Sequence, residues 1–112
     1  MTLSTHVLDI ATGRPAAAVA VGLQRLDGAK WIHVSSALTN ADGRVPSVVP
    51  SGVDAPAGTY RLTFDVGAYF AARQQDSFYA TIVIDFVARD DSQHYHVPLL
   101  LGPYGYSTYR GS

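Results

Sequence analysis

The chain of 112 residues contains no cysteine, which excludes disulfide bonds, zinc–thiolate sites and thiol nucleophiles. It also lacks any apolar run of the length, about 18 residues, that marks a transmembrane helix. The N-terminus lacks the basic and apolar regions of a secretory signal, and the terminal Arg-Gly-Ser is not a peroxisomal tripeptide. From these missing signals we expect a cytoplasmic protein without a membrane partner.

Charge is scarce as well. Asp, Glu, Lys and Arg make up 15% of the residues, against about a quarter in an average domain. The formal net charge is −1, and Lys30 is the only lysine among cationic residues that are scattered along the chain. Proteins that bind nucleic acid usually carry a basic patch, and this scattered distribution gives no indication of one. So little charge on a small chain instead favours an oligomer that hides part of its surface.

What the chain does contain is a series of short alternating segments separated by turn residues. The clearest spans residues 58–66, where Tyr60, Leu62 and Phe64 share one face. Further strands are predicted at residues 3–9, 18–26, 31–35, 81–88, 94–101 and 104–109, and a two-turn helix at residues 68–75. About eight strands at this spacing predict an all-β, two-sheet antiparallel sandwich with one short helix, in a single domain of residues 1–112.

The four histidines fall into two groups. His6 and His96 occupy mid-strand positions where an apolar residue would be the ordinary choice, so a functional role is open for both. His94 and His33 are more simply interpreted as a strand-end residue and a solvated strand residue. Since His94 and His96 share one strand face, they could also join His6 in a three-histidine zinc site.

The remaining candidates are one arginine and the C-terminus. The guanidinium of Arg44, after an Asp-Gly turn, could hold an oxygen-rich substrate or a developing oxyanion, although a solvated turn arginine is the simpler interpretation. The chain ends at Ser112 in an aromatic and polar run where most termini are featureless, so we expect this end to be used. No Gly-x-Ser-x-Gly motif accompanies Ser112, so a conventional serine-hydrolase nucleophile is unsupported.

Several motifs together resemble one family, the 5-hydroxyisourate hydrolases, also called transthyretin-like or transthyretin-related proteins. They are LSTHVLD at residues 3–9, TGRP at 12–15, DGR at 42–44, HYHVP at 94–98 and YSTYRGS at 106–112. The resemblance extends from residue 3 to residue 112. It implies an eight-stranded transthyretin-type sandwich and a homotetramer, a dimer of dimers, with active sites in the channel between dimers.

The resemblance also implies a reaction and the residues that perform it. In urate degradation, 5-hydroxyisourate and water give 2-oxo-4-hydroxy-4-carboxy-5-ureidoimidazoline, with no metal or organic cofactor. The implied catalytic residues are His6, Arg44, His96 and Ser112. The implied substrate-binding residues are Arg44, Tyr109, Arg110 and Gly111.

A mechanism for these residues follows from the chemistry of lactam opening, which needs a base, an oxyanion partner and a proton for the departing nitrogen. We hypothesise that His6 and His96 bracket a water, with their division of labour left open, and that Arg44 stabilises the tetrahedral intermediate. Ser112 would hydrogen-bond a histidine or the water, and Arg110 would alternatively anchor the tail. The rival interpretations are a non-catalytic small-molecule carrier of the transthyretin type, the zinc enzyme, and a structural interaction domain.

Overall fold

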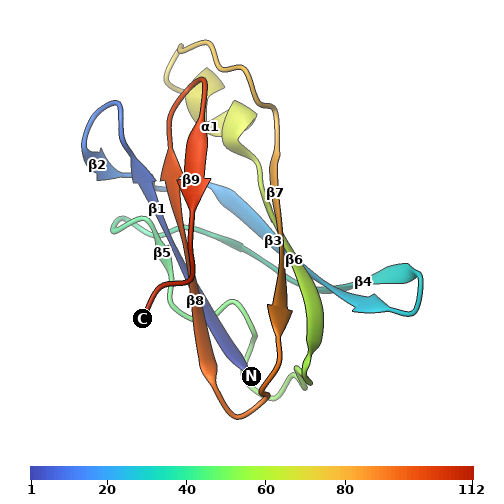
Figure 1. Ribbon diagram of the computed structural model, residues 1–112. Coiled ribbons are helices and arrows are strands. Elements are labelled where there is room, and N and C mark those ends of the chain that lie inside the picture. The colour runs from blue at the N-terminus through green and yellow to red at the C-terminus, as the bar shows by residue number, and fades with distance from the viewer.

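The computed structural model describes all of residues 1–112 and forms two β-sheets packed face to face, with a short helix near one end (Figure 1). The elements, in chain order, are β1 (Thr2–Asp9), β2 (Arg14–Pro15), β3 (Ala20–Asp27), β4 (Lys30–Leu38), β5 (Arg44–Val45), β6 (Gly58–Phe64), α1 (Val66–Ala71), β7 (Ile82–Ala88), β8 (His94–Leu101) and β9 (Tyr106–Thr108). One sheet has the order β2-β1-β8-β9, with β5 also pairing with β1, and the other has the order β4-β3-β6-β7. The predicted all-β sandwich with one short helix is confirmed.

The pairing of β1 with β8 decides where the polar residues meet. These two strands lie at opposite ends of the sequence and pair in parallel, from Thr2 opposite His94 to Asp9 opposite Leu101. Every other strand pair is antiparallel, as the hairpin spacing predicts. The two strands of a parallel pair need not follow each other in the sequence. The sequence around β1 or β8 therefore does not reveal their pairing.

Alternating burial fixes which side chains point outward. The core holds 23 buried apolar residues, among them Tyr60, Leu62 and Phe64 from the clearest predicted strand. In β1 the buried positions are Leu3, Thr5, Val7 and Asp9, and in β8 they include Tyr95, Val97, Leu99 and Leu101. The intervening residues of both strands therefore face away from the core, on one outer surface of the sandwich.

The helix begins earlier than the prediction of residues 68–75. Asp65 caps it, since its carboxylate accepts a hydrogen bond from the N–H of Ala68 at 3.2 Å, and α1 then runs from Val66 to Ala71. The backbone turns into a left-handed conformation at Gln74, with φ of 56°, which ends the helical segment. No helix of the chain is long and apolar enough to span a membrane.

Candidate active site

The outer face of the β1–β8 pair brings together the two histidines that the sequence singled out. Ser4 lies opposite His96 and His6 lies opposite Pro98, so His6 and His96 are diagonal neighbours on adjacent strands. Ordinary strand rise and spacing separate their Cα atoms by about 8 Å. Both histidines are half-buried.

Arg44 joins this face through a tight turn between β4 and β5. The side-chain oxygen of Asn40 accepts a hydrogen bond from the N–H of Arg44 at 3.0 Å. Gly43 has a φ of 73°, and a Cβ at this position would collide with the carbonyl oxygen of Val7, so the turn fits against β1 only as glycine. The short β5 then pairs with β1 in a register that places Arg44 opposite His6.

The guanidinium of Arg44 is not engaged by any side chain. It is exposed, and the one ion pair of the chain joins Arg61 to Asp85 on the other sheet. Its five N–H donors are therefore available to a ligand with carbonyl or carboxylate oxygens on the His6–His96 face.

A continuous chain of hydrogen bonds runs along this face to His96. Thr2 Oγ1 lies 2.6 Å from Nδ1 of His94, and Nε2 of His94 lies 2.8 Å from Ser4 Oγ. The same Ser4 Oγ lies 2.8 Å from Nδ1 of His96. These contacts orient the His96 ring through Nδ1 and leave its Nε2 as the nitrogen without a partner in the chain.

The surroundings of His96 favour its neutral form. Burial lowers the pKa of His96 below its ordinary value of 6.5, and the positive charge of Arg44 lowers it further. Smaller effects of His6 and His94 act in the same direction, and hydrogen bonding at Ser4 partly opposes them. A neutral imidazole with a free nitrogen is able to accept a proton near pH 7.

The C-terminal tail packs directly on His96. The N–H of Gly111 donates to the carbonyl oxygen of His96 at 2.8 Å, in an isolated bridge that follows the β8–β9 hairpin (Figure 1). A Cβ at Gly111 would lie 2.5 Å from Cδ2 of the His96 ring, so only glycine allows this approach. Ser112 follows and is exposed, without a hydrogen bond in the chain.

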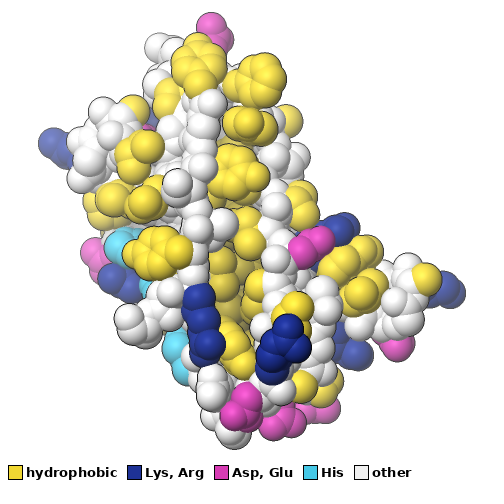
Figure 2. All heavy atoms as spheres, viewed as in Figure 1, with side chains coloured by type: hydrophobic (Ala, Val, Ile, Leu, Met, Phe, Trp, Pro, Cys, Tyr) yellow, Lys and Arg dark blue, Asp and Glu magenta, His cyan; other side chains and the backbone are white.

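Tyr109 and Arg110 lie elsewhere, in the groove between the two sheets. This cavity of about 280 Å³ is lined by β7, β8 and the tail, including both residues. The Arg110 guanidinium lies 4.7 Å from the centre of the Tyr95 ring and donates to the side chain of Gln93 at 2.9 Å. Figure 2 shows a band of apolar side chains down the middle of this view, with the histidines to its left. The contacts of Arg110 with Tyr95 and Gln93 are those of a residue that anchors the tail.

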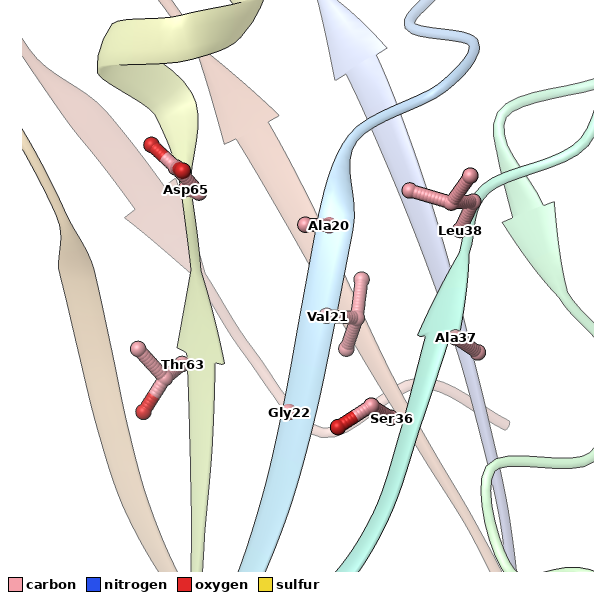
Figure 3. Close-up of a pocket in the computed structure, with 8 residues that line it drawn as sticks. All are labelled: Ala20, Val21, Gly22, Ser36, Ala37, Leu38, Thr63 and Asp65. Atoms are coloured by element: carbon pink, nitrogen blue, oxygen red, sulfur yellow. The ribbon is translucent and has the colours of Figure 1, made fainter.

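The largest cavity lies on the other sheet and carries no catalytic group. It measures about 430 Å³ and lies over β3, β4 and β6, where small side chains such as Ala20, Gly22 and Ser36 leave a shallow hollow (Figure 3). Its one charged residue, Asp65, is already engaged as the cap of α1. Neither cavity contains His6, Arg44 or His96, which lie on an open face.

The three-histidine arrangement that the zinc alternative requires is not present. No group of three or more His, Cys, Asp or Glu side chains is placed to hold a metal ion. His94, one of the three histidines that this alternative needs, has both ring nitrogens in contact with the hydroxyls of Thr2 and Ser4. His33 lies on β4 of the opposite sheet, exposed and far in the topology from the other three histidines.

Sequence reasoning missed Ser4 and Thr2. Alternation places Ser4 on the face of His6, and this signal was available in the sequence. The contact of Ser4 with His94 and His96 was not, because it depends on the parallel register of strands 92 residues apart.

Comparisons with known proteins agree with this geometry. Residues 3–111 match the model of the HIUase/Transthyretin family. The chain belongs to this family. A relative in Mesorhizobium japonicum, named 5-hydroxyisourate hydrolase, is 46% identical over 98% of this chain and 91% of its own length.

Two solved structures with different printed functions have the same fold as this chain. The structure of Klebsiella pneumoniae 5-hydroxyisourate hydrolase superposes with a TM-score of 0.86 at 45% identity, over the full length of both chains. Sea bream transthyretin in complex with thyroxine gives a TM-score of 0.90 at 29% identity, over 97% of this chain and 93% of that one. The fold is common to both, and the sequence is more similar to the hydrolase.

Proposed function

We propose that this protein hydrolyses 5-hydroxyisourate, opening its lactam ring with water to give 2-oxo-4-hydroxy-4-carboxy-5-ureidoimidazoline. The observation that carries the proposal is the meeting of His6, Arg44 and His96 on one face of β1, β5 and β8. Relatives that share 46% and 45% of its residues are named 5-hydroxyisourate hydrolase, which supports the same substrate here. The domain that performs the reaction spans residues 1–112, and its place of action is the cytoplasm.

Arg44 supplies the electrostatic part of the reaction. Attack of water on the lactam carbonyl makes a tetrahedral intermediate with a negative oxygen, and a guanidinium without a protein partner stabilises such a charge. Removal of one oxyanion donor typically costs about 100- to 1,000-fold in turnover. The close contact of Gly43 with β1 fixes the backbone of Arg44 opposite His6, so its side chain starts from a defined position on this face.

The two histidines serve the proton transfers, one by taking the proton of the water and the other by positioning the water or protonating the leaving nitrogen. The C–O bond forms as a base takes a proton from water, and the C–N bond breaks as the lactam nitrogen receives one. His6 and His96 flank the position of the attacking water from adjacent strands. Both transfers need groups that titrate near neutrality, and imidazole is the side chain with that property.

The tail completes the site. Gly111 covers the His96 ring, so the hydroxyl and carboxylate of Ser112 come next to the histidines, where Ser112 hydrogen-bonds the water or an imidazole. Tyr109 and Arg110 contribute to substrate binding through the position of this tail, which Arg110 holds by its contacts with Tyr95 and Gln93.

The open character of the face supports a site that is completed by other subunits. His6, Arg44 and His96 lie outside both cavities, on a surface that one chain leaves uncovered. In the proposed homotetramer, a dimer of dimers, these surfaces line the channel between dimers and enclose the substrate. Enclosure excludes bulk water and strengthens the interaction of Arg44 with the developing charge.

A carrier function is the alternative, because sea bream transthyretin binds thyroxine with the same fold. A site for an apolar hormone does not require two histidines and an unpaired guanidinium on one face. The higher identity to the hydrolases also favours catalysis.

The test is a coupled assay in which urate oxidase generates 5-hydroxyisourate and its ultraviolet absorbance is followed with and without the protein. Accelerated decay that persists with a chelator is the expected result. Acceleration lost on chelation would assign the site to a metal. A folded protein that leaves the decay rate unchanged would refute the hydrolase and turn attention to ligand binding.

A further inference from the structure

The polar chain that ends at His96 continues to the surface of the protein, and the proposed reaction uses only its last member. Four side chains take part in the order Thr2, His94, Ser4 and His96, with contacts of 2.6, 2.8 and 2.8 Å. Thr2 and His94 are exposed, whereas His96 is half-buried. The chain thus connects the active-site face with solvent through groups that both donate and accept protons.

The chemistry of Ser4 couples the two imidazoles. Its hydroxyl has one proton and contacts a ring nitrogen on each side, so it donates to one ring and accepts from the other. If Ser4 donates to His94, then His96 carries its proton on Nδ1 and its Nε2 is a free base. If Ser4 donates to His96, then Nε2 of His96 carries the proton. The tautomers of the two rings therefore change together.

We propose that Thr2, His94 and Ser4 form a proton relay that connects Nε2 of His96 with solvent and makes His96 the base of the reaction. The inference rests on the proposed hydrolysis of 5-hydroxyisourate and deepens it. It gives His96 the proton transfers that spacing alone left open between His6 and His96, and it leaves His6 to position the water. It also gives His94 a function as a positioning and relay residue.

In the forward step, each bond that forms is matched by one that breaks. The water O–H bond breaks, its electron pair forms the new C–O bond, and the proton goes to Nε2 of His96. The Nδ1 proton of His96 passes to Ser4 Oγ, the Ser4 proton passes to Nε2 of His94, and the Nδ1 proton of His94 passes to Thr2. The hydroxyl proton of Thr2 leaves to solvent. All four groups end neutral.

The reverse step resets the relay. When the C–N bond breaks, its electron pair stays on nitrogen, and the Nε2 proton of His96 goes to that nitrogen. A proton from solvent enters at Thr2 and each link returns to its first state. One water is consumed, and the carboxylic acid that forms ionises in solution. His96 never carries a full positive charge, which is consistent with the positive Arg44 guanidinium on the same face.

Other charged groups around the relay do not replace it. His6 lies on the same face of β1, and Arg44 lies opposite it on β5. Neither forms a side-chain hydrogen bond with Ser4 or His94, so the path to solvent runs through Thr2 and His94 alone within the chain.

The kinetic test compares turnover of 5-hydroxyisourate by the full-length wild type with that of Ser4→Ala, Ser4→Thr and His94→Ala. We expect kcat to fall about 10- to 100-fold in Ser4→Ala and His94→Ala, by analogy with the loss when the hydrogen-bond partner of a metal-ligating histidine is removed. Ser4→Thr keeps the hydroxyl and should retain most of the activity. His33→Ala, the same change on the opposite sheet, is the matched control and should behave as the wild type.

Two readouts separate a relay from a merely structural role. Added imidazole should restore kcat of His94→Ala in proportion to its concentration, because the exposed gap next to Ser4 admits an external proton carrier. In mixtures of H₂O and D₂O, kcat of the wild type should follow a curve, since several protons move together, and kcat of Ser4→Ala should follow a straight line.

The relay is overturned if His94→Ala turns over at the wild-type rate, if imidazole fails to restore it, or if the wild-type isotope plot is linear. That last measurement needs no variant, so misfolding of Ser4→Ala does not remove the test. An inactive wild type would instead refute the proposed hydrolysis and the catalytic role of the relay together. In that case ¹⁵N NMR of the rings still shows whether Ser4→Ala uncouples the tautomers of His94 and His96.

Discussion

The two sheets of the sandwich present outer faces that differ in how their polar side chains are held. On the β1–β8 face, Ser4 links His94 and His96 through hydrogen bonds, and the tail covers the His96 ring. On the β3–β4–β6 face, small residues leave a wide hollow, and the principal polar contact is the exposed ion pair of Arg61 with Asp85. The largest cavity and the cluster of hydrogen-bonded histidines therefore lie on different faces of this protein.

The difference shows what a surface needs in order to become a reactive site. Both faces come from the same alternation of buried and outward residues. Only the β1–β8 face joins segments from the two ends of the chain and fixes their side chains through mutual contacts. Chemistry requires groups held at a defined orientation, and a row of solvated side chains does not provide this.

The largest expected effect comes from deleting the C-terminal tail that packs on His96 at the β1–β8 face. Deletion of residues 109–112 should reduce turnover to background, because it removes Ser112 and exposes the His96 ring. The core strands and the proposed tetramer should persist, since Gly111 makes the one backbone hydrogen bond from these residues to β8. Activity is measured in the coupled assay and assembly by analytical ultracentrifugation. A fully active truncated protein would show that the tail is structural only.

A smaller change to the same contact should have an intermediate effect. Gly111→Ala places a methyl group 2.5 Å from Cδ2 of His96, so the ring or the tail must move, and we expect a loss in kcat of about 10-fold or more. Gly22→Ala is the matched control in the hollow of the other face, where a Cβ meets nothing within 4 Å. Equal kcat values for the two variants would contradict the difference between the faces.

Protonation provides a third test. The pKa of His96 is lowered first by burial and then by Arg44, so titration of its ring by NMR should give a midpoint below 6.5. As the pH falls, the unfolded chain binds this proton before the folded one, so the group reduces stability below about pH 6.5. The acid limb of kcat/KM should follow the folded-state value.

Arg44→Gln should raise the midpoint of His96 without returning it fully to 6.5, because burial is the larger cause. Arg61→Gln, which removes the same charge from the other sheet, should leave it unchanged. An unshifted midpoint in Arg44→Gln would mean that Arg44 does not act on the His96 ring.

The smallest effect is expected on the second face itself. Arg61→Gln breaks the ion pair with Asp85. The side chain of Arg61 is 30% exposed and that of Asp85 is 46% exposed, so solvent and salt already screen the interaction. The urea midpoint and kcat should both stay close to the wild-type values. A marked loss of turnover would show that this face takes part in the reaction.

The sequence predicted the orientation of the key side chains better than their partners. Alternation puts Ser4 on one strand face with His6, and His94 on one with His96, and the structure shows that both faces point outward. It carried no information on the parallel pairing of β1 with β8, because periodicity describes one strand and not its neighbour. The functional roles came from the resemblance to the hydrolase family, and the family membership is confirmed.

Two local differences have clear physical reasons. The helix starts at Val66 because the Asp65 carboxylate caps it, whereas the strand alternation appeared to continue through that residue. The resemblance assigned substrate binding to Tyr109 and Arg110, which stays a prediction; their side chains line the groove between the sheets, whereas Gly111 contacts His96. The residues of the terminal motif therefore lie on two different surfaces, because the tail crosses the edge of β8.

The most direct test of the account compares the histidines of the two faces in the coupled 5-hydroxyisourate assay. We predict that His6→Ala and His96→Ala each lower turnover by about 100-fold or more with the fold intact, whereas His33→Ala stays at the wild-type rate. Circular dichroism confirms folding of each variant. Near-wild-type turnover by the His6 and His96 variants would contradict the assignment of catalysis to the β1–β8 face.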